Sequence, residues 1–116
     1  MEYKMLLSPE KIGGLEIKNR VVMTAMGCSL ANLDGTPSDE IIAYYVERAK
    51  GGVGLIINEV TRVDDETGVT EIRQLCMTKD ENVPAFQKLT DAVHEAGAKI
   101  FCQLHHPGRH LLELMR

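Results

Sequence analysis

The stretch Lys99-Ile-Phe-Cys-Gln-Leu-His-His-Pro-Gly-Arg109 decides the predicted fold. Residues 100–104 are apolar except for Gln103, and Pro107-Gly108 ends the run, which is typical of a short buried strand. A buried amide without a hydrogen-bond partner costs roughly 1–3 kcal/mol, so Gln103 needs one. A flat heteroaromatic ligand lying across the strand end would supply it. A neighbouring backbone group is the alternative partner.

Two further apolar segments have the same design. Residues 20–24 and 53–58 are predicted strands, and each is followed by polar or small residues. The core of the first, Val-Val-Met, lacks polar alternation, as expected for a strand covered on both faces. Three apolar strands that each have polar or small residues at the C-terminal end indicate a parallel α/β sheet with a site along one rim.

Helices are predicted between these strands. The first begins with Thr36 as its cap and Pro37 at the first helical position, and ends at Lys50 before two glycines. The second is expected over residues 83–96 with Asn82 as its cap. Apolar residues at helical spacing give each helix one buried face: Ile41, Tyr45 and Ala49 in the first, and Phe86, Leu89 and Val93 in the second.

The predicted order is therefore βαβαβ, preceded by a short hairpin that turns at Gly13-Gly14. The connections after the first two strands, residues 25–35 and 59–81, are eleven and twenty-three residues long. Loops of this length in a compact domain are usually functional. They follow the C-terminal ends of parallel strands, where α/β enzymes place their active sites.

Composition excludes several functional classes. The 116 residues suit a single domain, and their net charge of −4 comes with scattered basic residues, which argues against nucleic acid as a partner. No apolar run reaches the roughly 20 residues that span a bilayer, and the first 20 residues lack the apolar core of a secretory signal. The odd number of cysteines (Cys28, Cys76 and Cys102) and the absence of C-x-x-C spacing predict reduced thiols in a cytoplasmic protein.

Three separated motifs carry a resemblance to a known family. They are LEIKNRVVM at residues 15–23; Tyr44-Tyr45 followed by RAKGGVGLII at residues 48–57 with Glu59; and QLHHPGR at residues 103–109. In this order and spacing the chain resembles the Old Yellow Enzyme family of FMN-dependent NAD(P)H:flavin oxidoreductases. The nearest branch is the 2-enoate and 2,4-dienoyl-CoA reductase group. The three motifs together span nearly the whole chain.

This resemblance implies a (β/α)8 TIM barrel with FMN at its C-terminal mouth. Since a complete barrel needs roughly 250 residues, residues 1–116 are expected to form the N-terminal third of one, an incomplete FMN-binding domain. The family's substrate-anion residues, phosphate loops and proton donor would then fall after Arg116, as would the iron–sulfur segment and the second nucleotide-binding (FAD) domain of the reductase branch. No catalytic residue is assigned within the chain.

The resemblance also implies a set of flavin-contacting residues. The backbone of Ala25, Met26 and Gly27 would run beside the isoalloxazine, Val60 would lie near it, and the Gln103 amide would hydrogen-bond its pyrimidine side. Several relatives have Cys or His at position 27, so thiol tuning of the flavin there is not expected in this chain. The neighbouring Cys28 is not expected to take over that role.

Arg109 is added to the cofactor-binding set because it follows Pro-Gly at the end of the third strand. It would face an electron-rich edge of the flavin or an anionic substrate, or else form a loop ion pair with Glu59 or Glu113. Glu59 is expected to be an inward-facing carboxylate that fixes Arg109 or Arg20.

The three histidines near the chain's end could in principle share a metal. Cysteines and carboxylates at matching spacing do not accompany His105, His106 and His110. No metal site is therefore predicted, and these histidines are expected to line the site or face solvent.

The expected function is FMN-mediated transfer of hydride from NAD(P)H to the activated C=C bond of a small enoate or enone. Two alternatives stay open for the 116 residues by themselves, and with them the question of whether this chain is an enzyme. One is a non-catalytic partial barrel that hides its open strand edges by forming a homo-oligomer. The other is a small module that binds flavin without turnover.

Overall fold

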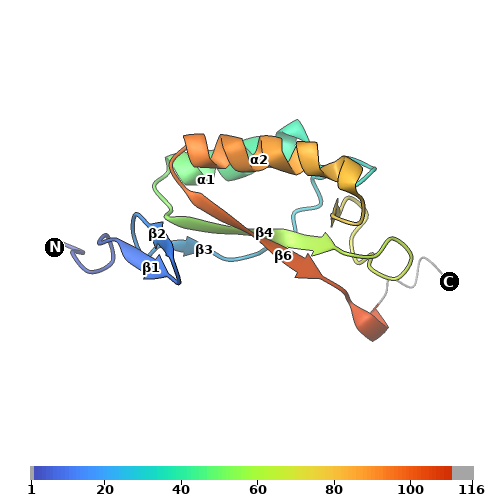
Figure 1. Ribbon diagram of the computed structural model, residues 1–116, viewed down its shortest axis with the longest axis horizontal. Helices are drawn as coiled ribbons and strands as arrows, with labels where there is room; N and C mark the ends of the chain where they lie inside the picture. The colour runs from blue at the N-terminus through green and yellow to red at the C-terminus, as the bar shows by residue number, and fades with distance from the viewer. Residues whose placement is uncertain (1, 111–116) are drawn as a thin grey trace.

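The chain folds as a mixed α/β structure in a computed structural model that describes residues 2–110 (Figure 1). In chain order the elements are β1 (Glu10–Ile12), β2 (Leu15–Ile17), β3 (Val22–Met23), α1 (Asp39–Lys50), β4 (Leu55–Arg62), β5 (Leu75–Cys76), the 3-10 turn η1 (Asp80–Asn82), α2 (Val83–Glu95), β6 (Lys99–His105) and the 3-10 turn η2 (Gly108–His110).

The main sheet confirms the predicted parallel arrangement. Strand β4 pairs in parallel with β3, β5 and β6, so it is the central strand of the four. Leu55 of β4 is in register with Val22 of β3 and with Lys99 of β6. The three strands predicted from the sequence therefore run in the same direction and end at the same edge.

The predicted hairpin is also confirmed. Strands β1 and β2 pair antiparallel, with Glu10 opposite Ile17, and they form a separate two-stranded sheet. Gly13 has a φ of +58° at the turn, a conformation that favours glycine.

Both long helices lie on the same side of the main sheet (Figure 1). The predicted apolar faces of α1 and α2 are buried there and enclose one core, whose members include Ile41, Tyr45, Ala49, Ile56, Leu75, Phe86, Leu89 and Val93. No helix covers the opposite face of the sheet, so residues 2–110 form part of an α/β architecture and no closed barrel.

The N-terminus of α1 lies two residues later than predicted. The cap is Ser38, whose Oγ accepts a hydrogen bond from the Ile41 amide at 3.1 Å. Thr36 cannot serve because both its backbone N–H and its hydroxyl donate to Asp34 Oδ1, at 2.9 and 2.6 Å. A local turn therefore competes successfully for this residue.

Helix α2 begins at Val83 as predicted, but Asn82 does not cap it with its side chain. Residues 80–82 form a 3-10 turn, and the Asn82 amide instead donates to the carbonyl oxygen of Cys76 at 2.9 Å. Asn82 thus ties the end of β5 to the start of α2.

Strand β4 is longer than predicted. It continues past Asn58 to Arg62, because Thr61 and Arg62 pair with β5 on one side and with residues 104 and 105 of β6 on the other. A register shift between Ile57 and Val60 marks an irregularity in the β4–β6 ladder. Glu59 and Val60 accordingly lie within a strand and not in a loop.

Strand β6 is not buried, contrary to the prediction from its apolar composition. Within the described part of the chain it has β4 as its single neighbour, and its outer positions face solvent. Phe101 is 37% exposed and Leu104 is 64% exposed, whereas Ile100 packs against the helix-side core.

The helices that the structure describes include none long and apolar enough to cross a membrane.

Candidate functional site

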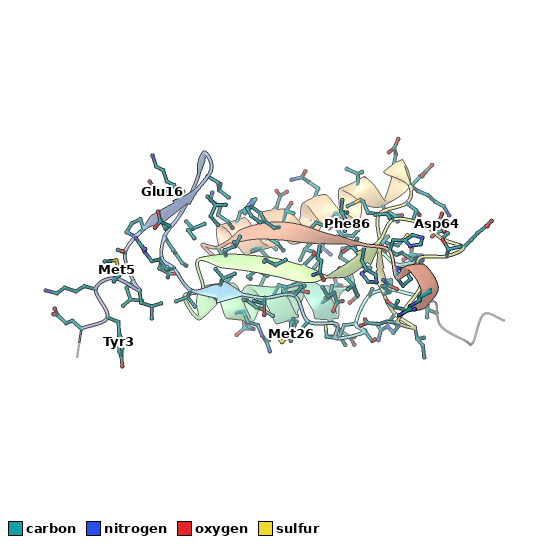
Figure 2. All side chains as sticks on the ribbon, turned by 90° about the horizontal axis from the view of Figure 1, so that it is seen from below. Tyr3, Met5, Glu16, Met26, Asp64 and Phe86 are labelled. Carbon is teal, nitrogen blue, oxygen red and sulfur yellow. The ribbon has the colours of Figure 1, made fainter. Side chains whose placement is uncertain are left out.

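Most of the predicted site residues lie in or just after the C-terminal parts of three neighbouring strands, at the same edge of the sheet. Val60 of β4 and Gln103 of β6 are register partners, so the structure brings these two directly together. Ala25, Met26 and Gly27 leave the end of β3 on the other side of β4. Figure 2 shows β6, β4 and β3 side by side on the uncovered face of the sheet, with Met26 on the β3 side.

The side chain of Gln103 is exposed, so the prediction of a buried amide is wrong for these residues. The cause is the edge position of β6, which leaves the amide on the uncovered rim. Its side chain forms no hydrogen bond within residues 2–110, while its backbone N–H donates to Asn58 Oδ1 at 2.8 Å. Both functions of the Gln103 amide, donor and acceptor, are therefore free to bind a ligand.

Asn58 is a site-supporting residue that the sequence reasoning missed. Its side chain is 2% exposed, and by accepting from Gln103 N–H it closes the β4–β6 ladder at its irregular point. The available signal was a lone amide at the end of an apolar strand.

The backbone of residues 25–27 also has unused hydrogen-bonding capacity. No N–H or C=O of Ala25, Met26 or Gly27 is hydrogen-bonded in the region that the structure describes, and the Met26 side chain is 53% exposed. Backbone groups left open beside exposed apolar atoms suit the edge and face of a planar heteroaromatic ring.

A carboxyl group lies beside the exposed Gly27. A Cβ at this position would overlap the carboxyl group of Glu71, which also lies 3.4 Å from the hydroxyl of Ser29. Glu71 therefore occupies the space that a side chain at position 27 would need.

Glu59 and Cys28 form the most buried polar contact near the rim. The Glu59 side chain is 0% exposed, and its Oε2 accepts from the Cys28 N–H at 2.6 Å and from the Cys28 thiol at 2.8 Å. Its Oε1 is buried without a hydrogen-bond partner among the residues described.

The expected ion pairs of Glu59 are absent from residues 2–110. Arg20 pairs instead with Glu10, at 2.8 Å, and Arg109 is an exposed residue of η2 with no ion pair to a described residue. The alternative partner Glu113 lies outside the described residues. The prediction that Glu59 fixes Arg20 or Arg109 is therefore wrong, because the carboxyl faces a thiol and a backbone amide in place of a cation.

Burial raises the pKa values of both Glu59 and Cys28. Desolvation, with a further contribution from nearby Glu71, raises the pKa of the Glu59 carboxyl. Desolvation and the contact with Glu59 raise the pKa of the Cys28 thiol to about 12. The thiol thus stays protonated at neutral pH, which makes Cys28 unsuited to nucleophilic chemistry.

Tyr45, the second residue of the Tyr44-Tyr45 motif, has a structural role beside the rim. Its fully buried hydroxyl accepts a hydrogen bond from the Glu59 backbone N–H at 2.8 Å, which connects α1 to β4 beside the rim. Tyr44 is partly buried and lies under the Arg48 guanidinium, 3.6 Å from the ring centroid.

The histidines at and after the end of β6 differ in their contacts. His106 Nδ1 accepts from the Gly108 N–H at 3.0 Å, and its Nε2 lies 2.9 Å from the Thr67 hydroxyl. His105 Nε2 is buried without a partner among the residues that the structure describes. These residues contain no group of three or more metal-ligating side chains, and the side chain of His110 lies outside the described set.

Comparison with protein families and curated proteins gives extensive matches. The NADH:flavin oxidoreductase / NADH oxidase family matches residues 5–115. An NADH oxidase of Thermoanaerobacter brockii is 50% identical over 104 residues, and the match covers 90% of this chain and 16% of the relative. A Listeria monocytogenes NADPH dehydrogenase is 44% identical over 105 residues, with coverages of 90% and 31%. A cinnamate reductase of Clostridium sporogenes is 43% identical over 107 residues, with coverages of 89% and 16%.

Solved structures agree with these matches. The Old Yellow Enzyme homologue of Zymomonas mobilis superposes with a TM-score of 0.78 at 35% identity, over 87% of this chain and 28% of that one. Morphinone reductase in complex with tetrahydroNAD gives a TM-score of 0.84 at 32% identity, over 96% of this chain and 30% of that one. The chain thus spans between about a sixth and a third of the length of the proteins it matches.

Proposed function

Because the chain belongs to the NADH:flavin oxidoreductase / NADH oxidase family, we propose that it forms part of the FMN site of an ene-reductase. In this proposal residues 1–116 make up the N-terminal third of a (β/α)8 barrel domain. The parallel strands and the two helices on one side of them are similar to part of the Old Yellow Enzyme homologue and of morphinone reductase.

One observation carries the proposal: the unused hydrogen-bonding groups at the ends of neighbouring strands. Gln103 presents a free amide, residues 25–27 present free backbone groups, and Val60 lies in register beside Gln103. A planar heteroaromatic ring needs donors and acceptors at its edge and apolar atoms against its face, so these residues fit a flavin.

Each of these residues would make a different contact with the flavin. The Gln103 amide would hydrogen-bond the polar edge of the ring, Val60 and Met26 would contact its apolar parts, and the Arg109 cation would lie near the rim. Bound FMN supplies hydride transfer between NAD(P)H and an activated C=C bond. The chain's own contribution is to bind and orient the ring.

The proposed acceptor is a small enoate or enone. The cinnamate reductase relative supports an α,β-unsaturated carboxylate, while the names NADH oxidase and NADPH dehydrogenase support a nicotinamide cofactor as the reductant. We place the protein in the cytoplasm on the basis of its three free cysteines. Any iron–sulfur cluster or FAD would be bound by segments outside residues 1–116.

The test is reconstitution of the natural polypeptide that contains residues 1–116 with FMN, followed by anaerobic oxidation of NADH or NADPH with cinnamate as acceptor. We expect oxidation that depends on both FMN and cinnamate, and a product reduced at the C=C bond. A polypeptide that neither binds FMN nor oxidises either nucleotide would contradict the proposal.

A second proposal concerns residues 1–116 as a separate polypeptide, for which we expect self-association. Strands β3 and β6 are the edges of the β3–β4–β6 part of the sheet, and Val22, Phe101 and Leu104 expose apolar surface on them. Such edges favour pairing with another copy. Sedimentation equilibrium of the separate chain tests this: we expect an oligomer, and a monomer would contradict it.

A further inference from the structure

The buried carboxyl of Glu59 is the starting point. It is inaccessible to solvent, it forms no ion pair within residues 2–110, and both hydrogen bonds that its carboxyl accepts from these residues come from Cys28. A group without access to solvent or to the rim cannot exchange a proton with a substrate directly. The carboxyl therefore acts through its hydrogen bonds on the loop that contains Cys28.

That loop has a constrained conformation immediately after Cys28. Ser29 has a φ of +51°, in the left-handed region that is unfavourable for a residue with a side chain. Such a conformation persists where the surroundings hold it in place. Beyond Ser29, Arg73 donates from its Nε to the Ala31 carbonyl at 2.6 Å and from its Nη2 to the Leu30 carbonyl at 3.1 Å.

The part of the loop before Cys28 lacks such hydrogen bonds within residues 2–110. Residues 25–27 form no backbone hydrogen bond in the part of the chain that the structure describes. Cys28 is thus the boundary between a well-anchored part of the loop and the free segment assigned to the flavin. The Glu59 carboxyl is the group that holds this boundary, through two hydrogen bonds of 2.6 and 2.8 Å.

Glu59 is itself well fixed. It belongs to the central strand β4, and its backbone N–H donates to the buried hydroxyl of Tyr45. The position of the Cys28 amide is therefore set by the core of the fold, because strand β4 and helix α1 determine where the carboxyl lies.

We propose that Glu59 is a positioning residue that fixes Cys28 and thereby holds the backbone of residues 25–27 in place against the flavin. This inference rests on the proposed function, since the object that is positioned is the flavin-contacting segment. It adds a role for a buried carboxyl that touches neither cofactor nor substrate.

The test compares FMN binding by wild-type protein, Glu59→Ala and Glu59→Gln in the natural polypeptide containing residues 1–116. Loss of two hydrogen bonds to a carboxyl is expected to weaken FMN binding at least about tenfold in Glu59→Ala. Glu59→Gln keeps an acceptor oxygen for the Cys28 N–H and is expected to stay within a few-fold of wild type. Binding is measured by quenching of FMN fluorescence.

Two further readouts separate positioning from general destabilisation. The absorption spectrum of bound FMN is expected to shift in Glu59→Ala, because the groups beside the ring move. Hydrogen exchange of the Cys28 amide, which is hydrogen-bonded to Glu59, is expected to be faster in Glu59→Ala when measured without FMN. Asn82→Ala is the matched control, since it removes a buried amide whose hydrogen bond within residues 2–110 goes to the Cys76 carbonyl and not to residues 25–31.

A second pair of variants covers the case in which Glu59→Ala does not fold. Cys28→Ser keeps a side-chain donor to Glu59 and Cys28→Ala removes it, so Ser is expected to bind FMN more tightly than Ala. The proposal is overturned if wild type binds FMN and either pair shows equal affinity, spectrum and exchange. If the wild-type protein does not bind FMN at all, the proposed FMN site is contradicted. A wild-type protein that binds FMN, with variants that do not differ, contradicts only the positioning role of Glu59.

Discussion

The carboxyl oxygen Oε2 of Glu59 lies 2.6 Å from the backbone nitrogen of Cys28, across 31 residues of sequence. This contact joins the central strand β4 to the loop that follows β3. It also places a protonated thiol and a carboxyl with a raised pKa side by side, with testable consequences for the reactivity of Cys28 and for stability.

The first prediction is that Cys28 reacts slowly with alkylating agents. A pKa raised from 9.0 to about 12 lowers the thiolate fraction near pH 8 by roughly a thousandfold. Cys102 is exposed and is expected to react first with iodoacetamide, as followed by mass spectrometry of peptides. Equal labelling of Cys28 and Cys102 in folded protein would contradict this, and unfolding in urea should remove the difference.

The second prediction concerns the pH dependence of stability. The folded-state pKa of Glu59 is raised above its usual value of 4.5, so its stabilising contribution is fully present below pH 4.5 and is lost as pH rises through the folded-state pKa. The free energy of unfolding of wild type, relative to Glu59→Gln, is therefore expected to fall as pH rises above 4.5 and then to level off. Urea unfolding at a series of pH values measures this. A difference that stays flat or increases with pH would show that burial does not control this carboxyl.

The third prediction tests the link between α1 and β4. In Tyr45→Phe the buried N–H of Glu59 loses its acceptor, which is expected to lower the free energy of unfolding by roughly 1–3 kcal/mol. Tyr3→Phe is the control, because Tyr3 is 60% exposed. Thermal unfolding of the two variants compares them directly, and equal melting temperatures would rule out a structural role for the hydroxyl.

The fourth prediction contrasts two glycines. A Cβ at Gly54 would lie 2.6 Å from the backbone oxygen of Asn19, so Gly54→Ala requires movement of the main chain and is expected to be strongly destabilising. A Cβ at Gly27 meets only the end of the Glu71 side chain, which can rotate away. Gly27→Ala is expected to keep near-wild-type stability in chemical denaturation; comparable losses in both variants would disprove the distinction.

The two helices and the order of the three main strands along the chain could be predicted because their signals are local, whereas the short β5 was not predicted. Ile41, Tyr45 and Ala49 recur at helical spacing, and Gly97 with its φ of +90° separates α2 from β6. The cap of α1 could not be predicted because Thr36 and Ser38 are both good caps. The hydrogen bonds from Thr36 to Asp34 decide between them.

The end of β4 could not be predicted because it depends on distant strands. Thr61 and Arg62 have no apolar signal, and they are held in the sheet by pairing with β5 and β6. The adjacency of Val60 and Gln103 follows from this extension. The contact between Glu59 and Cys28 is equally non-local, and its only sequence signal was a carboxyl within an apolar run.

The most direct test of the whole account is the affinity of FMN for wild type, Gln103→Leu and Lys99→Gln in the natural polypeptide containing residues 1–116. Gln103 is exposed at the proposed flavin edge and Lys99 is exposed at the opposite end of β6. We expect Gln103→Leu to weaken FMN binding about tenfold without loss of stability, and Lys99→Gln to bind as wild type does. Unchanged FMN affinity in Gln103→Leu would contradict a flavin site at these strand ends.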